Sequence, residues 1–297
     1  MLSMESAAAA QQTRNAQTRH ARDEYGPHRQ LVMKVISHAQ RHDVQHLGTQ
    51  PQMRGGNRLQ SLCLLGVGNG NDVELNELVT WFERVELVDI DGTAMHWARV
   101  QVPEGPRNRL HIHPTDVSGI FSCLGRSAYS GDADQLIRRA HDAEVTLPFQ
   151  PCDVVVSSCM LTQLIDAAVD AVGIDALFLD DLASAIVDRH LRLLLELTAD
   201  EGRAVLITDF VSSDTFPDLP DLPQHELRRA VARQLETGNF FVGMHPGTLK
   251  RRWLALAAHR RPINKIELRG PWRWQLGSRT LAVVALTAQL ADMPTPK

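Results

Sequence analysis

The sequence predicts an α/β fold with a doubly wound, mostly parallel sheet. Continuous apolar or β-branched runs, of the kind buried on both faces of a parallel sheet, occur at residues 62–67 and 153–158. Segments with helical periodicity follow these runs and alternate with further short strands. Alternation of strands and helices is typical of parallel strands joined by helical crossovers.

The first apolar run leads into a glycine turn, within the sequence SLCLLGVGNGNDVELNELVTWFERVELVDID at residues 61–91. Three glycines alternate with other residues directly after the strand: Gly66, Gly68 and Gly70. Asn71 and Asp72 can cap the helix that follows, and a second strand, residues 85–88, ends in Asp89. A strand, a glycine turn, a helix and a second strand ending in a carboxylate form a unit that binds the ribose of an adenosine cofactor.

The glycine spacing separates two classes of cofactor. Dinucleotide-binding turns read G-x-G-x-x-G, which would require a glycine at position 71, where this chain has Asn71. The observed G-x-G-x-G is the spacing seen in enzymes that use S-adenosylmethionine. The spacing therefore disfavours, without excluding, an NAD-dependent oxidoreductase.

With these residues the chain resembles the class I S-adenosylmethionine-dependent methyltransferases, whose domain would span residues 60–297. The resemblance implies a Rossmann-like, seven-stranded sheet with an antiparallel last strand, and S-adenosyl-L-methionine as the cofactor. It also implies that the glycine turn packs against the amino-acid end of the donor and that Asp89 holds the ribose. Members of this family usually carry an acid two positions before the first glycine, where this chain has Leu64. Asp72 is the candidate substitute, and Leu64 keeps open a non-catalytic, S-adenosylmethionine-binding regulatory protein.

The segment ahead of the first strand divides into a tail and a helix. Residues 1–21 are small and polar, which predicts a disordered or weakly helical tail, and residues 22–59 are expected to form a helical lid and a linker. In the resembled family such helices often close over the active site, so Tyr25 and His28 are lid candidates; a helix that only packs is the alternative. Histidines four residues apart in this region lack a further ligand at suitable spacing, so no metal site is predicted: His38, His42 and His46.

The third strand is expected within residues 110–116, LHIHPTD, and leads to Asp116. In the resembled family the acid at this strand tip bonds the adenine amino group, which makes Asp116 the adenine candidate. His113 lies on one face of the same strand. Residues 119–150 lengthen the crossover that follows and carry no motif that assigns them a role.

The fourth strand, residues 153–158, is followed by residues that in the resembled family face the transferable methyl group. Ser157 and Ser158 are therefore candidates for the cofactor site, with Cys159 and Gln163 beside them. Ligands in open α/β sheets bind outside the carboxyl ends of the strands, which agrees with this position.

The predicted fifth strand, residues 203–210, ends near Asp209, and two strands close the chain. Trp272 and Trp274 are expected in the connection between these two strands, as exposed indoles that contact a ligand or partner; capping of the sheet edge is the alternative. Methyl transfer needs a base only if the acceptor is a hydroxyl or a protonated amine. The candidate bases are three: Asp209, His113 and His245.

The composition of the chain argues against several classes of protein. A net charge of -4 argues against a dedicated nucleic-acid surface, and no apolar run approaches the ~20 residues of a membrane span. The four cysteines form no C-x-x-C pair, which favours reduced thiols and a cytoplasmic location. The sequence thus predicts a methyltransferase that acts on a small molecule, without a nucleic-acid or membrane partner.

Overall fold

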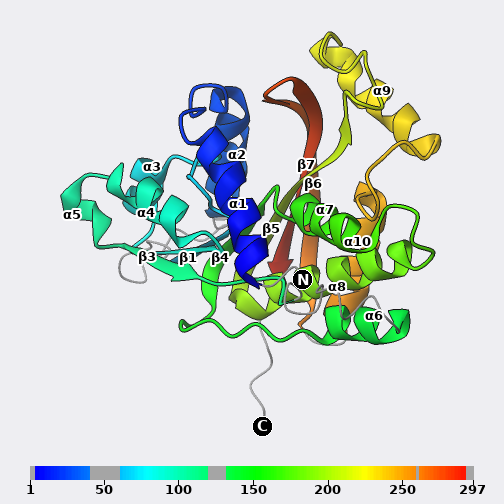
Figure 1. Ribbon diagram of the computed structural model, residues 1–297. Coiled ribbons are helices and arrows are strands. Elements are labelled where there is room, and N and C mark those ends of the chain that lie inside the picture. The colour runs from blue at the N-terminus through cyan, green and yellow to red at the C-terminus, as the bar shows by residue number, and fades with distance from the viewer. Residues whose placement is uncertain (1–3, 41–60, 120–131, 259–260, 292–297) are drawn as a thin grey trace, which may run out of the picture.

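The computed structural model describes residues 4–40, 61–119, 132–258 and 261–291 (Figure 1). Seven strands form one sheet in the order β3-β2-β1-β4-β5-β7-β6. Their bounds are β1 Ser61–Leu65, β2 Arg84–Asp89, β3 Leu110–Pro114, β4 Cys152–Ser158, β5 Thr198–Ser212, β6 Ile263–Leu276 and β7 Arg279–Leu290. Strand β7 is antiparallel to both of its neighbours, whereas the pairs from β3 to β5 are parallel. The predicted α/β fold class is confirmed.

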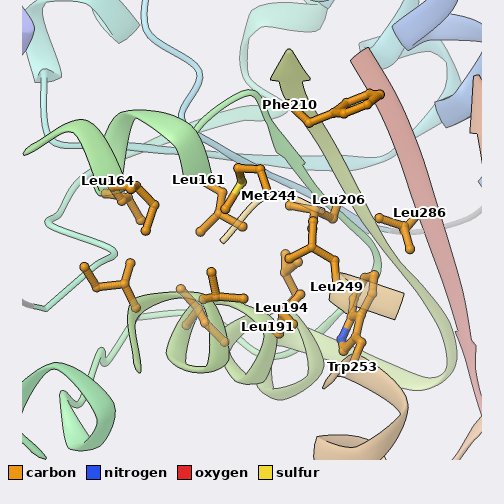
Figure 2. Close-up of a cluster of buried hydrophobic side chains, with 14 of the residues drawn as sticks. Leu161, Leu164, Leu191, Leu194, Leu206, Phe210, Met244, Leu249, Trp253 and Leu286 are labelled. Atoms are coloured by element: carbon orange, nitrogen blue, oxygen red, sulfur yellow. The ribbon is translucent and has the colours of Figure 1, made fainter. Parts of the chain in front are cut away.

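Helices cover both faces of this sheet. They are α1 Met4–Thr18, α2 Gly26–Gln40, α3 Leu75–Trp81, α4 Gly92–Val100, α5 Glu104–Arg107, α6 Ala133–Asp142, α7 Leu161–Val172, α8 Leu179–Leu197, α9 Gln224–Glu236 and α10 Pro246–Ala258. One apolar core joins α2, α3 and α4 to the sheet, and a second joins it to α7, α8 and α10. Figure 2 shows the second core, where Leu161 of α7, Leu191 of α8 and Trp253 of α10 lie close to Leu206 of β5.

The β-branched run of β4 explains its central position, because its side chains are buried on both faces of the sheet. Val154 and Val156 belong to the core beneath α2, and Val155 belongs to the core beneath α8. Successive side chains of a strand point to opposite faces. Ser157 and Ser158 must therefore face opposite sides of the sheet, so only one of them can face α2.

The N-terminal segment contains a helix. For residues 1–21 the composition predicts a disordered or weakly helical tail, and the structure has helix α1 there. Hydrogen bonds to distant residues order this helix, for example from the Asn15 side chain to Asp91. The expected linker after α2, with His42 and His46, lies outside the described residues.

Trp272 and Trp274 differ from their expectation, because both belong to strand β6 and are buried. Helix α2 packs against β6 and covers the two indoles, so they are core residues rather than exposed loop residues. Strand β5 likewise continues past Asp209 to Ser212, so Asp209 is a buried residue within the strand. In the described part of the chain, no helix combines the length and apolar character that crossing a membrane requires.

Candidate functional site

The glycine turn after β1 adopts a backbone conformation that requires glycine. Gly66, Gly68 and Gly70 have φ values of 75°, 48° and 70°, in the left-handed region. A Cβ atom on Gly66 would lie 2.9 Å from the Cβ of Met160, and one on Gly68 would lie 2.9 Å from the Asn15 Oδ1. Conformation and packing together therefore exclude a Cβ atom at these positions, and the side chains of Met160 and Asn15 lie against the turn.

Asp89, at the end of β2, holds this turn in place. Its Oδ2 accepts a hydrogen bond from the Gly68 N–H at 2.9 Å, and its Oδ1 accepts one from the Asp91 N–H at 2.8 Å. Burial raises the pKa of this carboxyl to about 6. A carboxylate offers about four lone-pair positions, so Asp89 retains capacity for further donors such as sugar hydroxyls.

Helix α1 lies against the same turn. The Asn15 Nδ2 donates to the Asp91 Oδ2 at 2.8 Å, and the Asn69 side chain donates to the Asn15 carbonyl at 2.6 Å. Asn71 donates to the carbonyl of Thr18 at 2.8 Å. This role of α1 is not visible in the sequence, because a polar, alanine-rich helix gives no local signal of what it contacts.

A small cleft lies between α1 and the carboxyl ends of the first strands. It is lined by Gly66, Asp89 and Asp116, together with Met160 after β4 and Arg14 of α1. Its free volume is about 40 Å³, whereas pockets for small ligands usually have about 300–1,000 Å³. The structure thus brings three residues of the predicted cofactor site to one cleft, with α1 closed over it.

Asp116 and its neighbours form the far wall of this cleft. The Asp116 Oδ1 accepts from the backbone N–H of Ser118 at 2.9 Å and from the Ser118 hydroxyl at 2.5 Å. Gln163, on the first turn of α7, lines the same cleft and donates to the Cys159 carbonyl at 3.1 Å.

Asp72 belongs to a second group of polar residues, on the α2 side of the sheet. Its Oδ2 accepts from the Ser158 hydroxyl at 3.3 Å, while its Oδ1 is buried without a hydrogen-bond partner in the described residues. The side chain as a whole is 19% exposed, but burial of the carboxyl group raises its pKa to about 7. The Asp72 Oδ1 lies 3.8 Å from the Nε2 of His28.

His28, at the start of α2, is locked in one tautomer. Its Nδ1 accepts a hydrogen bond from the Trp272 Nε1 at 3.1 Å, and its ring stacks on Trp274 with 4.4 Å between the centroids. Burial lowers the pKa of His28 to about 3, so the ring is neutral at ordinary pH. Because Nδ1 accepts, the single ring proton is on Nε2, the nitrogen that faces Asp72. Tyr25, the other lid candidate, packs edge-on against Trp274.

Asp209 completes this second group. Its Oδ1 accepts from the Thr162 hydroxyl at 2.7 Å, and burial raises its pKa to about 6. The negative charge of Asp209 adds to the raised pKa of Asp72, so the two carboxyls are electrostatically coupled. Between them along the chain, Cys159 has a φ of 47°, a strained conformation for a residue other than glycine. Such strain is common where a chain positions functional groups.

Three residues predicted for the site have other partners. Ser157 faces α8, and its hydroxyl lies 2.8 Å from the His190 Nε2, because the strand alternation directs it away from Ser158. His113 lies 2.6 Å from the Glu86 Oε2 in the neighbouring strand. His245 accepts from the Thr248 N–H at 3.2 Å and so caps the start of α10. The described structure does not bring these three side chains to the glycine turn or to Asp72, so their predicted roles receive no support from their positions.

Among the described residues, no group of three histidine, cysteine or acidic side chains is arranged to hold a metal ion. The cysteines in this part of the chain are free thiols: Cys63, Cys152 and Cys159.

No protein-family model and no curated protein sequence matches the chain. Among solved structures, it is similar to the N-methyltransferase NodS from Bradyrhizobium japonicum WM9, with 10% identity, a TM-score of 0.38, and coverage of 79% of this chain and 87% of that one. It is similar to an O-methyltransferase family protein from Burkholderia thailandensis, with 14% identity, a TM-score of 0.42, and coverage of 96% and 64%. A third is the DhpI–SAM–HEP complex, with 11% identity, a TM-score of 0.42, and coverage of 94% and 96%.

The strand order of the sheet is the feature that classifies this chain. A topological switch between β1 and β4 places the glycine turn, Asp89 and Asp116 at one edge of the sheet, and one antiparallel strand lies between β5 and β6. The chain therefore has the Rossmann-like fold of the class I S-adenosylmethionine-dependent methyltransferases.

Proposed function

We propose that this chain transfers the methyl group of S-adenosylmethionine to a small-molecule acceptor. The observation that carries the proposal is the sign of the charge around the glycine turn. Asp89, Asp91 and Asp116 lie at the turn and the small cleft beside it, and the second group on the α2 side of the sheet adds Asp72 and Asp209. A donor with a sulfonium and an ammonium group is positively charged at one end, which complements these acids.

Three arginines lie near the turn. Arg22 donates to the Gly70 carbonyl at 3.2 Å and Arg29 to the Asn71 carbonyl at 2.9 Å, and each also forms an ion pair of 2.5 Å with Glu74. Arg14 is the one cation among the described residues that line the small cleft. The acids around the turn outnumber these arginines, which disfavours the pyrophosphate of a dinucleotide. This charge distribution favours S-adenosylmethionine over NAD and agrees with the glycine spacing.

The residues present fit such a donor in two respects. The glycine turn offers backbone without Cβ atoms, and Asp72 has a buried oxygen that lacks a partner in the described structure. Asp89 would hold the ribose, Asp116 the adenine end and Asp72 the amino end. S-adenosylmethionine, when bound, supplies a methyl group on positively charged sulfur, and the carbon–sulfur electron pair stays on sulfur when the acceptor forms its new bond.

The chain itself would contribute alignment, exclusion of water and a proton acceptor. Residues of helix α1 and Met160 line the small cleft and would keep water from a bound donor. If the acceptor is a hydroxyl or an ammonium group, its proton passes to Asp209, whose raised pKa of about 6 makes it a stronger base than an exposed aspartate. Thr162, which donates to the Asp209 Oδ1, orients this carboxylate.

Calorimetric titration with S-adenosylmethionine, S-adenosylhomocysteine and NAD tests the proposal directly. We expect micromolar binding of the first two ligands and no measurable binding of NAD. Binding of NAD alone, or of none of the three, would rule out the assignment.

A non-catalytic binding protein is the second candidate. Leu64, in place of the usual acid, and the closure of the cleft by α1 favour it. Incubation with S-adenosylmethionine and a panel of small acceptors distinguishes the two functions. Formation of S-adenosylhomocysteine supports the enzyme, whereas tight donor binding without turnover of any acceptor supports the binding protein.

Closure by α1 predicts that entry of the ligand is gated. Asn15→Ala removes the bond to Asp91, a charge-assisted hydrogen bond of the kind worth about 1.5–3 kcal/mol. We expect S-adenosylhomocysteine to associate about tenfold faster or more, since about 1.4 kcal/mol changes the open population tenfold. Stopped-flow fluorescence measures this rate. Thr13→Ala, on the same helix, removes only an exposed bond to the Ala9 carbonyl and is the control; equal rates in both variants and the wild type would contradict gating.

A further inference from the structure

A second and larger cleft lies between α2 and the outer strand β6. Its volume is about 760 Å³, within the range of about 300–1,000 Å³ that is usual for small-molecule pockets. Leu31 and Val35 of α2 form one apolar wall, and Trp272 and Pro271 of β6 form the opposite one. The segment after β5, at Pro220, closes one end.

The charges that line this cleft are mainly positive. Lys34, Arg269 and Arg273 face a single acid, Glu24, among the described lining residues. Arg269 forms a 3.1 Å ion pair with Glu267, but its Nε is buried without a partner in the described part of the chain. A buried donor of this kind is costly unless a ligand or water accepts from it. An anion in the cleft would satisfy it and offset the excess of positive charge.

His28 connects this cleft to the glycine turn. Its ring lines the cleft, and its Nε2 lies 3.8 Å from the Asp72 Oδ1 on the other side. Asp72 in turn accepts from Ser158 at the end of β4. One imidazole ring therefore separates the large cleft from the carboxyl that we assign to the amino end of the donor.

We propose that the cleft between α2 and β6 binds an organic anion with an apolar or aromatic body and a carboxylate or phosphate group. The apolar walls take the body of the molecule, and Lys34, Arg269 and Arg273 take its charge. This site is separate from the proposed cofactor site and does not rest on the proposed function.

Four naphthalene probes of similar shape test this proposal by calorimetric titration at low ionic strength. They are 2-naphthoate, 2-naphthyl phosphate, the neutral 2-naphthol and the cationic 2-naphthylmethylamine. We expect at least one anion to bind about tenfold or more tightly than the neutral and cationic probes, as one charge-assisted hydrogen bond would give. The more tightly bound of the two anions shows whether the cleft prefers a carboxylate or a phosphate group.

Substitutions at the cleft show whether the anion binds there. Arg273→Gln and Lys34→Gln should each weaken binding of the anion about three- to tenfold and leave binding of 2-naphthol unchanged. The control is Arg229→Gln, which removes an exposed charge on α9 outside the cleft. Equal binding of all four probes, no binding of any probe, or an equal loss in the control would overturn the proposal.

The two proposals fail in different ways. Binding of S-adenosylhomocysteine without binding of an anion would overturn the anion site and leave the cofactor assignment intact. Binding of an anion without S-adenosylhomocysteine would overturn the cofactor assignment and leave the anion site intact.

Discussion

Replacing Asp89 with alanine is expected to lower the affinity for S-adenosylmethionine and S-adenosylhomocysteine on the order of 100-fold or more. The carboxylate accepts from the Gly68 and Asp91 N–H groups, so its loss releases the glycine turn as well as the proposed ribose contact. Each charge-assisted hydrogen bond contributes about 1.5–3 kcal/mol, and about 1.4 kcal/mol corresponds to a tenfold change in affinity. Calorimetric titration of both ligands measures the loss.

A matched control separates this effect from a general loss of stability. Asp153→Ala also removes a carboxylate that accepts two hydrogen bonds, from the N–H and the hydroxyl of Ser61, but at the opposite end of β1. Both variants should unfold at a lower temperature than the wild type, and only Asp89→Ala should lose the ligands. Unchanged binding in Asp89→Ala would refute the ribose assignment, and an equal loss in Asp153→Ala would trace the effect to stability.

The affinity for S-adenosylmethionine is expected to rise about tenfold or more between pH 5.5 and pH 8. In this range Asp209, with a pKa of about 6, and Asp72, with a pKa of about 7, lose their protons and become negatively charged. Below its pKa, a group that must ionise for binding changes the affinity up to about tenfold per pH unit. S-adenosylhomocysteine lacks the sulfonium charge and should show a shallower dependence. Titrations of both ligands across this range give the two slopes.

Asp72→Asn is the variant that assigns this pH dependence. Both ligands carry the ammonium group to which Asp72 is assigned, so the variant should reduce the affinity for both at pH 8 and flatten the rise of each with pH. The difference that remains between the two ligands isolates the contribution of the sulfonium. Asp134→Asn, at an exposed position on α6, is the control. An unchanged pH profile in Asp72→Asn would contradict a role for this carboxyl in charge recognition.

The raised pKa of Asp72 also predicts that the stability of the folded protein falls as the pH rises. The folded-state pKa of Asp72, about 7, lies above the ordinary value of 3.8, so the folded protein binds more protons between these pH values. The contribution of Asp72 to the free energy of unfolding is therefore fully present below about pH 4 and is lost as the pH rises through 7. At pH 8 the variant Asp72→Asn should consequently unfold at a higher temperature than the wild type. This difference should shrink towards pH 4. Thermal unfolding of both proteins at the two pH values measures it.

Much of the fold follows from local patterns in the chain. The runs that form β1 and β4 are apolar because both faces of these strands are buried, and this property is visible in the sequence. The glycine turn is equally local, since the positive φ values at Gly66, Gly68 and Gly70 need the residues themselves and no distant partner. Asp89 could be predicted for the same reason, because the end of β2 lies a short, fixed distance along the chain from the turn.

The second half of the site could not be predicted in this way. Ser157 and Ser158 are adjacent and chemically equal, and only the burial of Val155 and Val156 on opposite faces decides that Ser158 meets Asp72. The side chain of His28 takes its partner from Trp272, 244 residues further along the chain. Contacts over such distances leave no periodicity in the sequence. The sequence therefore predicts His28 as a lid residue and Trp272 as an exposed indole, and only the packing of α2 on β6 shows that the two side chains are buried against each other.

By itself, therefore, the sequence determined the α/β class, the glycine turn and the acids at the ends of β2 and β3, because these depend on the conformational preferences and burial of neighbouring residues. Only the tertiary structure decided that α1 closes the small cleft, that the carboxyls of Asp72 and Asp209 are buried close enough to influence each other, and that a positively charged cleft lies beyond His28. These features depend on which elements pack together, and the free energy of that packing comes from apolar surface spread over the whole chain rather than from any one segment.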